Sequence, residues 1–213
     1  CEVLLNERVL EAVAPGTVLV EMSSARPETV LRLAEAYAAR GARVLDAPVS
    51  GGTDGAKNGA LTAVCGEEAE VLEEARPVLE VMCSKIYLVG GVGAGKSLKA
   101  VNNLLNAANT VLVAEAVNLI RRLGLDEETA YQVIKSCSGQ SCSFDARFGR
   151  IAAANFEGGF KLELMIKDLR IALSEAQGLP MPMSSLALQL YNMAAPDAAG
   201  LDFSAVSRLL AEK

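Results

Sequence analysis

The chain has 213 residues, of which 51% are apolar, and a formal net charge of −6 at pH 7. It is long enough to bury a substantial core in one large domain or two small ones. Acidic residues outnumber basic ones and there is no long run of Lys or Arg, which argues against a nucleic-acid partner. Polar residues interrupt the longest apolar stretches, so we predict no membrane span and no secretory signal, and expect a cytoplasmic protein.

Histidine is absent, and five cysteines occur without a CxxC pair. Without histidine the commonest general base and the commonest zinc ligand are missing, so we predict no metal site. Acid–base chemistry must then use Lys, Asp, Glu, Tyr or Cys. An odd number of cysteines in a chain of this size favours reduced thiols over a disulfide framework. They are Cys1, Cys65, Cys83, Cys137 and Cys142.

The first part of the chain alternates between helical and strand patterns. A helical piece and the turn at 14–16 lead into a buried strand over 17–22, which is typical of the middle of an α/β unit. We therefore expect the start of this domain to be missing. Further along, the pattern predicts helices over 27–40 and 67–81 and strands over 42–46, 60–65 and 85–89. Such alternation indicates an open sheet covered by helices.

After residue 95 the pattern indicates helices alone. One long helix is predicted over 97–123, ended by Gly124, and no strand is predicted beyond Val89. The chain therefore divides into an α/β part, residues 1–94, and an all-helical part, residues 95–213, joined by the long helix. The later helices are predicted over 127–136, 144–154, 162–177, 182–194 and 203–212.

The segment 90–97, GGVGAGKS, matches the phosphate-binding P-loop pattern GxxxxGK(S/T). In that pattern Lys96 would contact phosphate oxygens and Ser97 would bind magnesium. A P-loop protein, however, continues its sheet after this loop, and one later strand carries the acid that holds magnesium. No such strand is predicted here. We therefore expect a glycine turn for close packing, with Lys96 exposed to solvent and Lys96→Ala a mild change.

A second set of polar residues lies inside the long helix. Lys99, Asn102, Asn103 and Asn106 share one face and can converge on a small ligand. The same stripe is equally compatible with a solvated face or with a polar contact between helices.

Two other segments favour ligand binding. The turn at 46–52, DAPVSGG, follows a buried strand, and Ser50 with the amides of Gly51 and Gly52 can grip a carboxylate there. Near the C-terminus, MIKDL at 165–169 places Lys167 and Asp168 on an amphipathic helix.

Taken together, these segments closely resemble the β-hydroxyacid dehydrogenase family, which includes 3-hydroxyisobutyrate dehydrogenase and tartronate semialdehyde reductase. The resemblance covers essentially the whole chain, and its motifs in this order and spacing are specific. It implies an NAD(P)-binding Rossmann-type domain, a long interdomain helix, and an all-α domain that closes the site and forms a homo-oligomer contact. The motifs are MSSARPE at 22–28, DAPVSGG, GVGAGKSLKAVNN at 91–103, AEAVNLIRRLGLD at 114–126 and GGFKLELMIKDL at 158–169.

The resemblance also implies roles for individual residues. Lys99 matches the catalytic lysine, which would take or return the hydroxyl proton while NAD or NADP carries the hydride. Burial would lower the pKa of this lysine toward the useful range. A small carboxylate substrate would be held by Ser50, Gly51 and Gly52, and oriented by Asn103 with Asn102 beside it. Cofactor contacts would come from Ser24, where the family commonly has Thr, and from Phe160, Lys167 and Asp168.

Substrate choice within such a family depends on a few pocket residues, here expected to be Asn106, Phe144 and Arg147. The related 6-phosphogluconate dehydrogenases carry a glutamate where this chain has Asn106. That difference speaks against the decarboxylating branch.

The sequence departs from the family in one respect. The N-terminal strand followed by GxGxxG does not occur, so we expect an N-terminally truncated Rossmann-type domain with an open sheet edge and poor cofactor binding by this chain alone. Discrimination between NAD and NADP belongs to the same missing part. Two alternatives remain: a P-loop ATPase or kinase using 90–97, and a non-catalytic oligomerisation or binding fragment.

Overall fold

The structure is a computed structural model that describes residues 3–211. The chain forms two compact units, Cys1–Val101 and Asn102–Lys213. The long helix α5, Ala94–Arg122, begins in the first unit and continues through the second. Cys1 and Glu212, which fall within two of the predictions, lie outside the described residues.

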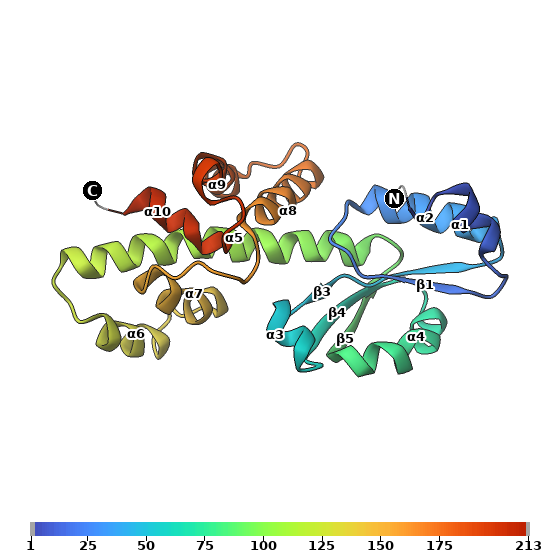
Figure 1. Ribbon diagram of the computed structural model, residues 1–213, viewed down its shortest axis with the longest axis horizontal. Coiled ribbons are helices and arrows are strands. Elements are labelled where there is room, and N and C mark those ends of the chain that lie inside the picture. Colours follow the sequence, from blue (N-terminus) through green and yellow to red (C-terminus); the bar gives the residue numbers. More distant parts are fainter. Residues whose placement is uncertain (1–2, 212–213) are drawn as a thin grey trace. The chain divides into compact units, whose positions relative to one another are not determined.

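The first unit alternates between strands and helices in the predicted order (Figure 1). The structure adds two short elements where only a turn was expected. Val49 and Ser50 form a strand because they pair with Ala63 and Thr62 of the neighbouring strand, and a short helix follows. The elements are α1 Glu7–Ala12, β1 Val18–Glu21, α2 Pro27–Ala38, β2 Arg43–Asp46, β3 Val49–Ser50, α3 Gly52–Lys57, β4 Leu61–Gly66, α4 Ala69–Met82 and β5 Cys83–Gly90.

Within the described part of the chain, the sheet has five strands and is mixed. Its order is β1-β2-β4-β3, with β5 also paired to β4. Strand β1 runs parallel to β2, and β4 runs parallel to β5, whereas β2 meets β4 antiparallel at Asp46 and Gly66. Strand β1 therefore ends the sheet on one side, and β2 is its neighbour.

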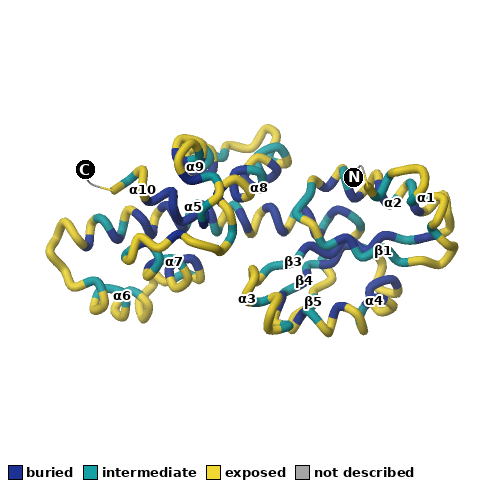
Figure 2. The backbone as a smooth tube through the Cα atoms, in the orientation of Figure 1, coloured by how far each residue is buried: buried dark blue, intermediate teal, exposed yellow. Residues whose placement is uncertain are grey.

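Both faces of this sheet are covered by helices, as predicted. Successive side chains of a strand point to opposite faces, so Val44 packs with Val30 and Leu33 of α2, while Leu45 packs with Leu79 of α4. The buried segments accordingly follow the strands and the inner sides of the helices (Figure 2). This sandwich holds the ends of β1 and β2 close to the turn that opens α5.

The second unit is all-helical around one core. Tyr191 and Phe203 are fully buried in it, and the Tyr191 hydroxyl donates a hydrogen bond to the Ala107 carbonyl oxygen at 3.1 Å. The predicted helix at 203–212 is instead a short 3-10 helix followed by one helical turn. The elements after α5 are α6 Glu127–Lys135, α7 Cys142–Ala152, α8 Leu162–Glu175, α9 Pro182–Ala198, η1 Phe203–Val206 and α10 Ser207–Leu210.

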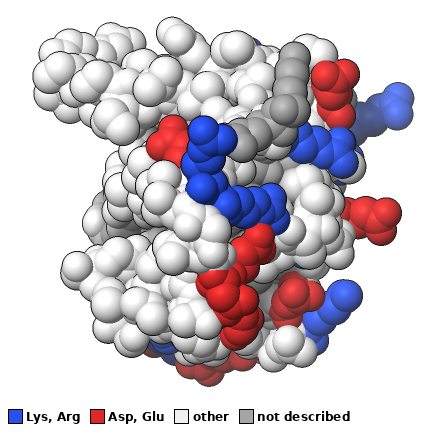
Figure 3. Space-filling view, turned by 90° about the vertical axis from the view of Figure 1, so that its left-hand side faces the viewer, with Lys and Arg blue, Asp and Glu red and all other residues white. Residues whose placement is uncertain are grey.

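Surface charge is mixed on the face seen in Figure 3, where acidic and basic side chains are interspersed. Among residues 3–211, no helix is long and apolar enough to span a bilayer. Cys65 and Cys83 are free buried thiols, and Cys137 and Cys142 are free exposed ones.

Candidate functional site

The glycine turn before α5 is occupied by a carboxylate of the protein itself. Asp46 ends β2, and its Oδ2 accepts hydrogen bonds from the backbone N–H groups of Gly93 at 3.1 Å and Lys96 at 3.0 Å. These are the unpaired donors of a helix N-terminus, where a negative charge is stabilised. Asp46 therefore caps α5 by accepting hydrogen bonds from the same N–H groups that a P-loop would offer to a phosphate.

Lys96 is buried, so the expectation that it is exposed to solvent is wrong. Its side chain has no exposed surface, and its ammonium lies 2.9 Å from Asp46 Oδ1. It also contacts the carboxylate of Glu21, at the end of β1, and donates to the Glu21 carbonyl oxygen at 3.1 Å. Buried charges are stable only when paired in this way. Because Lys96 and the turn amides are already engaged, the P-loop alternative is wrong too.

The expected close packing of the glycine turn is confirmed. A Cβ atom at Gly95 would lie 2.9 Å from Asp46 Oδ2 and would overlap the Val64 carbonyl oxygen. A Cβ atom at Gly66, the last residue of β4, would lie 2.6 Å from the Gly91 carbonyl oxygen. No side chain fits at either position, so β4 and the turn are in direct backbone contact.

The ionic cluster also determines how Glu21 titrates. Burial raises the pKa of Glu21, but hydrogen bonds from Lys96 and Ser23 and the positive charge of Lys96 outweigh burial. The pKa of Glu21 is therefore held below its ordinary value. The contacts of Glu21 with Lys96 and Ser23 therefore stabilise its ionised form.

The first unit carries five of the residues predicted for the site. Lys99 lies three residues after Lys96 on α5, and only 9% of it is exposed. Ser50 ends β3 and is half-buried, and Ser24 is half-buried between β1 and α2. Gly51 and Gly52 are exposed at the start of α3 with φ of +131° and +61°, which only glycine adopts readily.

The second unit carries a hydrogen-bonded network of four predicted residues. Asn103 is buried on α5, and its Nδ2 donates to Asp168 Oδ2 at 2.6 Å. Asn102 Nδ2 donates to Asn103 Oδ1 at 3.1 Å, and the Lys167 ammonium lies 2.9 Å from Asp168 Oδ1. An amide has two N–H donors and two lone pairs, and these two bonds use one of each on Asn103. Asp168, itself 2% exposed, fixes the orientation of that amide.

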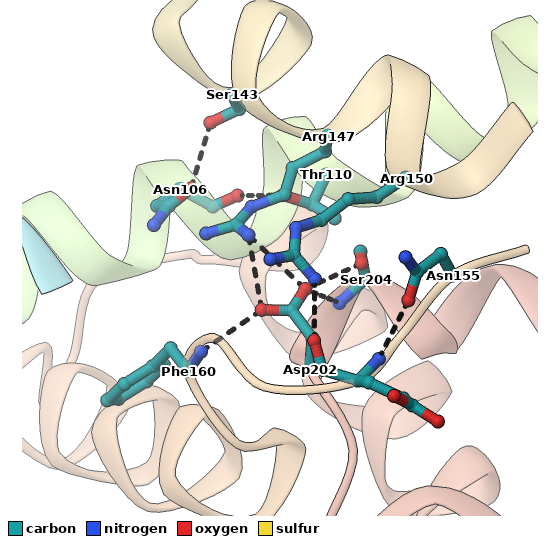
Figure 4. Close-up of polar contacts among 10 residues, drawn as sticks. Asn106, Thr110, Ser143, Arg147, Arg150, Asn155, Phe160, Asp202 and Ser204 are labelled. Carbon is teal, nitrogen blue, oxygen red and sulfur yellow. Dashed lines mark hydrogen bonds and ion pairs between the residues drawn. The ribbon is translucent and has the colours of Figure 1, made fainter. Parts of the chain in front are cut away.

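Figure 4 shows the polar contacts of three further predicted residues of this unit, Asn106, Arg147 and Phe160. Asp202 is fully buried and accepts hydrogen bonds from the Phe160 N–H at 3.0 Å and from Arg147 at 3.1 Å. The Phe160 ring points away from that carboxylate (Figure 4). Asn106 Oδ1 accepts from Ser143 Oγ at 3.0 Å.

Two of the residues expected to set substrate choice have internal partners. Arg147 is paired with Asp202 and stacks over the Phe203 ring, 4.4 Å from its centre. Burial lowers the pKa of Arg147, and the charge of Asp202 opposes that effect. Phe144 is buried in the core against Tyr131 and Phe148. Both side chains therefore stabilise the helical unit.

Sequence reasoning missed the roles of Glu21 and Asp46. Each acid ends a short apolar strand, VLVE at 18–21 and RVLD at 43–46. Both carboxylates are buried in the structure, and a buried charge requires a partner. The acid at each strand end is visible in the sequence, but it names no partner, since Lys96 lies 75 residues after Glu21 and 50 after Asp46.

Two family profiles match the chain. One describes the NAD-binding domain of 6-phosphogluconate dehydrogenase and matches residues 2–91. The other describes the NAD-binding region of NADP-dependent 3-hydroxyisobutyrate dehydrogenase and matches residues 93–210.

Individual relatives agree with these profiles. A 2-(hydroxymethyl)glutarate dehydrogenase of Eubacterium barkeri is 42% identical over 86% of this chain, which spans 62% of that protein's length. A 3-hydroxyisobutyrate dehydrogenase of Pseudomonas aeruginosa is 38% identical over 96% of this chain and 72% of its own length. The solved structure of Mycobacterium tuberculosis 3-hydroxyisobutyrate dehydrogenase with L-serine is 34% identical, with a TM-score of 0.89 over 98% of this chain and 76% of that one.

Proposed function

This chain belongs to the β-hydroxyacid dehydrogenase family, and from that membership we propose that it is part of an oxidoreductase that interconverts a small β-hydroxyacid and its semialdehyde with NAD or NADP. Residues 1–94 are the part of the dinucleotide-binding domain present here. Residues 95–213 are the helical domain for substrate and oligomer contacts. The nicotinamide would carry the hydride, so the protein must position the alcohol and manage one proton.

Lys99 is the residue we assign to that proton. The observation that carries the assignment is its place on α5, where it is buried one helical turn before the buried Asn103. In the oxidative direction the neutral amine accepts the hydroxyl proton as the hydride leaves the carbon. In reduction the ammonium returns a proton to the developing alkoxide. Asn103 orients the reacting oxygen through its side-chain amide.

The substrate carboxylate is assigned to Ser50, Gly51 and Gly52. Ser50 is half-buried at the end of β3, and the two glycines leave the backbone open to close approach. Donors of this kind suit a small anion and add no bulk around it.

The residues assigned to the cofactor fit a dinucleotide in their chemistry. The Lys167 side chain is 43% exposed and offers an ammonium to a phosphate or ribose oxygen, and Ser24 offers a hydroxyl. Phe160 presents an aromatic ring just before α8, the helix that carries Lys167. Asp168 acts through its two neighbours, Asn103 and Lys167.

A hydride-transfer assay tests this function. The intact protein, supplied with NAD⁺ or NADP⁺ and a panel of small 3-hydroxyacids, is followed by the absorbance of the reduced nicotinamide. We expect Lys99→Ala to lower kcat about 10²- to 10⁴-fold with its circular dichroism retained. Lys85→Ala, an exposed lysine on β5, is the matched control and should keep full activity. Absence of turnover across the panel, or a fully active Lys99→Ala variant, would contradict the proposal and favour a non-catalytic binding role.

We also propose that the helical domain forms a homo-oligomer through α5. Leu105, Leu112 and Leu119 recur every seven residues on this helix, and each is at least half exposed, at 56%, 50% and 58%. Such a spacing places the three leucines along one stripe. A second copy of the same helix would bury that stripe symmetrically.

A further inference from the structure

The three buried ionic residues each precede a segment that carries a predicted site group. Glu21 ends β1 three residues before Ser24, and Asp46 ends β2 four residues before Ser50. Lys96 lies in the first turn of α5, three residues before Lys99. We refer to Glu21, Asp46 and Lys96 as the Lys96 cluster.

The contacts of this cluster join the three segments at their backbones as well as at their side chains. Lys96 Nζ donates to the Glu21 carbonyl oxygen at 3.1 Å, and the same oxygen accepts the Ala47 N–H at 2.8 Å. Asp46 Oδ2 accepts the N–H groups of Gly93 and Lys96. The ends of both strands and the first turn of α5 are thus connected through one ammonium and one carboxylate.

Burial makes these connections sensitive to displacement. Lys96 and Asp46 have fully inaccessible side chains, and Glu21 retains about a tenth of its exposure. If one segment moved away, an ion would be left in the interior without its partner, which is strongly unfavourable. Apolar contacts, by contrast, tolerate sliding because they have no direction.

We propose that Lys96 is a positioning residue, whose ammonium fixes the placement of Ser24, the Ser50–Gly52 turn and Lys99 relative to one another. The inference rests on the proposed function, because those groups serve the hydride transfer assigned above. It replaces the expectation that Lys96→Ala is a mild change. Displacement of reacting groups by about 1 Å can lower a rate about 10²-fold, so a residue that touches no substrate can still control turnover.

The first test is the Lys96→Met variant of the intact protein, with Lys85→Met as the matched loss of an exposed ammonium. We expect kcat to fall about 10²-fold and the KM for the hydroxyacid to rise, because both Lys99 and the carboxylate turn are displaced. A purely structural role would lower the folded fraction and the apparent kcat while leaving KM unchanged. A folded Lys96→Met variant with wild-type kcat and KM would overturn the proposal.

Lys96→Met leaves two buried carboxylates without a cation and can fail to fold, so a second variant removes all three charges. The triple variant Glu21→Gln, Asp46→Asn, Lys96→Met avoids uncompensated charge, and such replacements are often neutral for stability. We expect it to fold while keeping a reduced kcat and a raised KM. Wild-type kinetics in this folded variant would show that the ammonium is not needed for placement.

A third measurement does not depend on activity. Amide hydrogen exchange reports whether the backbone connections loosen, and we expect the N–H groups of Ala47, Gly93 and Lys96 to exchange at least about tenfold faster in Lys96→Met. Lys99→Ala should leave them unchanged. Should the wild-type protein transfer no hydride, the proposed function fails, and this exchange pattern alone decides whether Lys96 fixes the three segments. Unchanged protection in Lys96→Met would overturn the inference.

Discussion

Asp46 holds Lys96 at both its backbone and its side chain: the Lys96 N–H donates to Oδ2 at 3.0 Å, and the Lys96 ammonium lies 2.9 Å from Oδ1. One carboxylate therefore caps the helix and neutralises the lysine that the helix carries. Loss of Asp46 would uncover a helix terminus and a buried cation together. This coupling explains why the glycine turn, the strand end and the start of α5 form one unit of packing.

We expect Gly95→Ala to destabilise the protein, although alanine is normally the better helix residue. The added Cβ would overlap the Val64 carbonyl oxygen and approach Asp46 Oδ2 to 2.9 Å. Overpacking of this kind costs about 1–3 kcal/mol in the free energy of unfolding. Gly149→Ala is the control, because no atom lies within 4 Å of its Cβ position in α7. It should be neutral or stabilise by up to about 1 kcal/mol, and urea denaturation of both variants checks the contrast.

The stability cost of Lys96→Met should depend on pH. In the wild type the pKa of Glu21 lies below its ordinary value of 4.5, so Glu21 stabilises the fold above that pH and loses its contribution as pH falls. Without the lysine, burial dominates and raises the pKa of Glu21, and stability is then lost as pH rises. The gap in unfolding free energy between the two proteins should therefore widen between about pH 4 and pH 7.

Urea denaturation across that range measures the gap. The second carboxylate of the Lys96 cluster is Asp46, which also pairs with the Lys96 ammonium. The Cys65 thiol beside it stays neutral, since burial, Cys83 and Asp46 raise its pKa to about 11. A gap that is constant with pH would mean that Lys96 contributes packing and no charge pairing.

Asp168→Asn should weaken catalysis through Asn103. The Asp168 carboxylate can only accept hydrogen bonds and therefore fixes which end of the Asn103 amide faces it. An asparagine at 168 permits either orientation and no longer pairs with Lys167. We expect kcat/KM for the hydroxyacid to fall about tenfold, measured by initial rates. Asp197→Asn, an exposed substitution on α9, is the control and should leave kcat/KM unchanged. An unchanged kcat/KM in Asp168→Asn would mean that the network does not orient Asn103.

Leu112→Glu should dissociate the proposed oligomer. Leu112 is the middle leucine of the α5 stripe, and a carboxylate there would be buried against its own symmetry copy. Light scattering coupled to size exclusion should show a lower molar mass for this variant. Val133→Glu on α6, at 55% exposure, is the control and should keep the wild-type mass. A monomeric wild type, or equal masses for all three proteins, would contradict the proposal.

Much of the fold follows from local patterns in the sequence. The periodicities of the longer helices and strands predict α2, α4, α5 and β2 to within a few residues, because their apolar faces repeat with the period of the element. Strand β3 and helix α3 escape this reasoning. Both are short, α3 contains Gly52 and Gly55, and β3 exists because Val49 and Ser50 pair with β4.

The site divides in the same way. Lys99 and Asn103 can be found from helical spacing and the resemblance of their motif, since both signals are local. The burial of Lys96 depends on carboxylates distant in the sequence, and no local pattern separates a buried lysine from a solvated one. The hydrogen bond from Asn103 to Asp168 likewise joins residues 65 positions apart.

The Asp46 carboxylate binds the N–H groups of the glycine turn that a phosphate would otherwise use. A free anion approaching the N–H groups of Gly93 and Lys96 meets Asp46 already bound to them, at an effective concentration that tethering sets at about millimolar or above. The eight-residue pattern at 90–97 predicts the turn but not which group binds its N–H donors. The P-loop pattern therefore also matches a turn whose N–H groups are bound by a carboxylate of the same chain, here Asp46 at the end of the earlier strand β2.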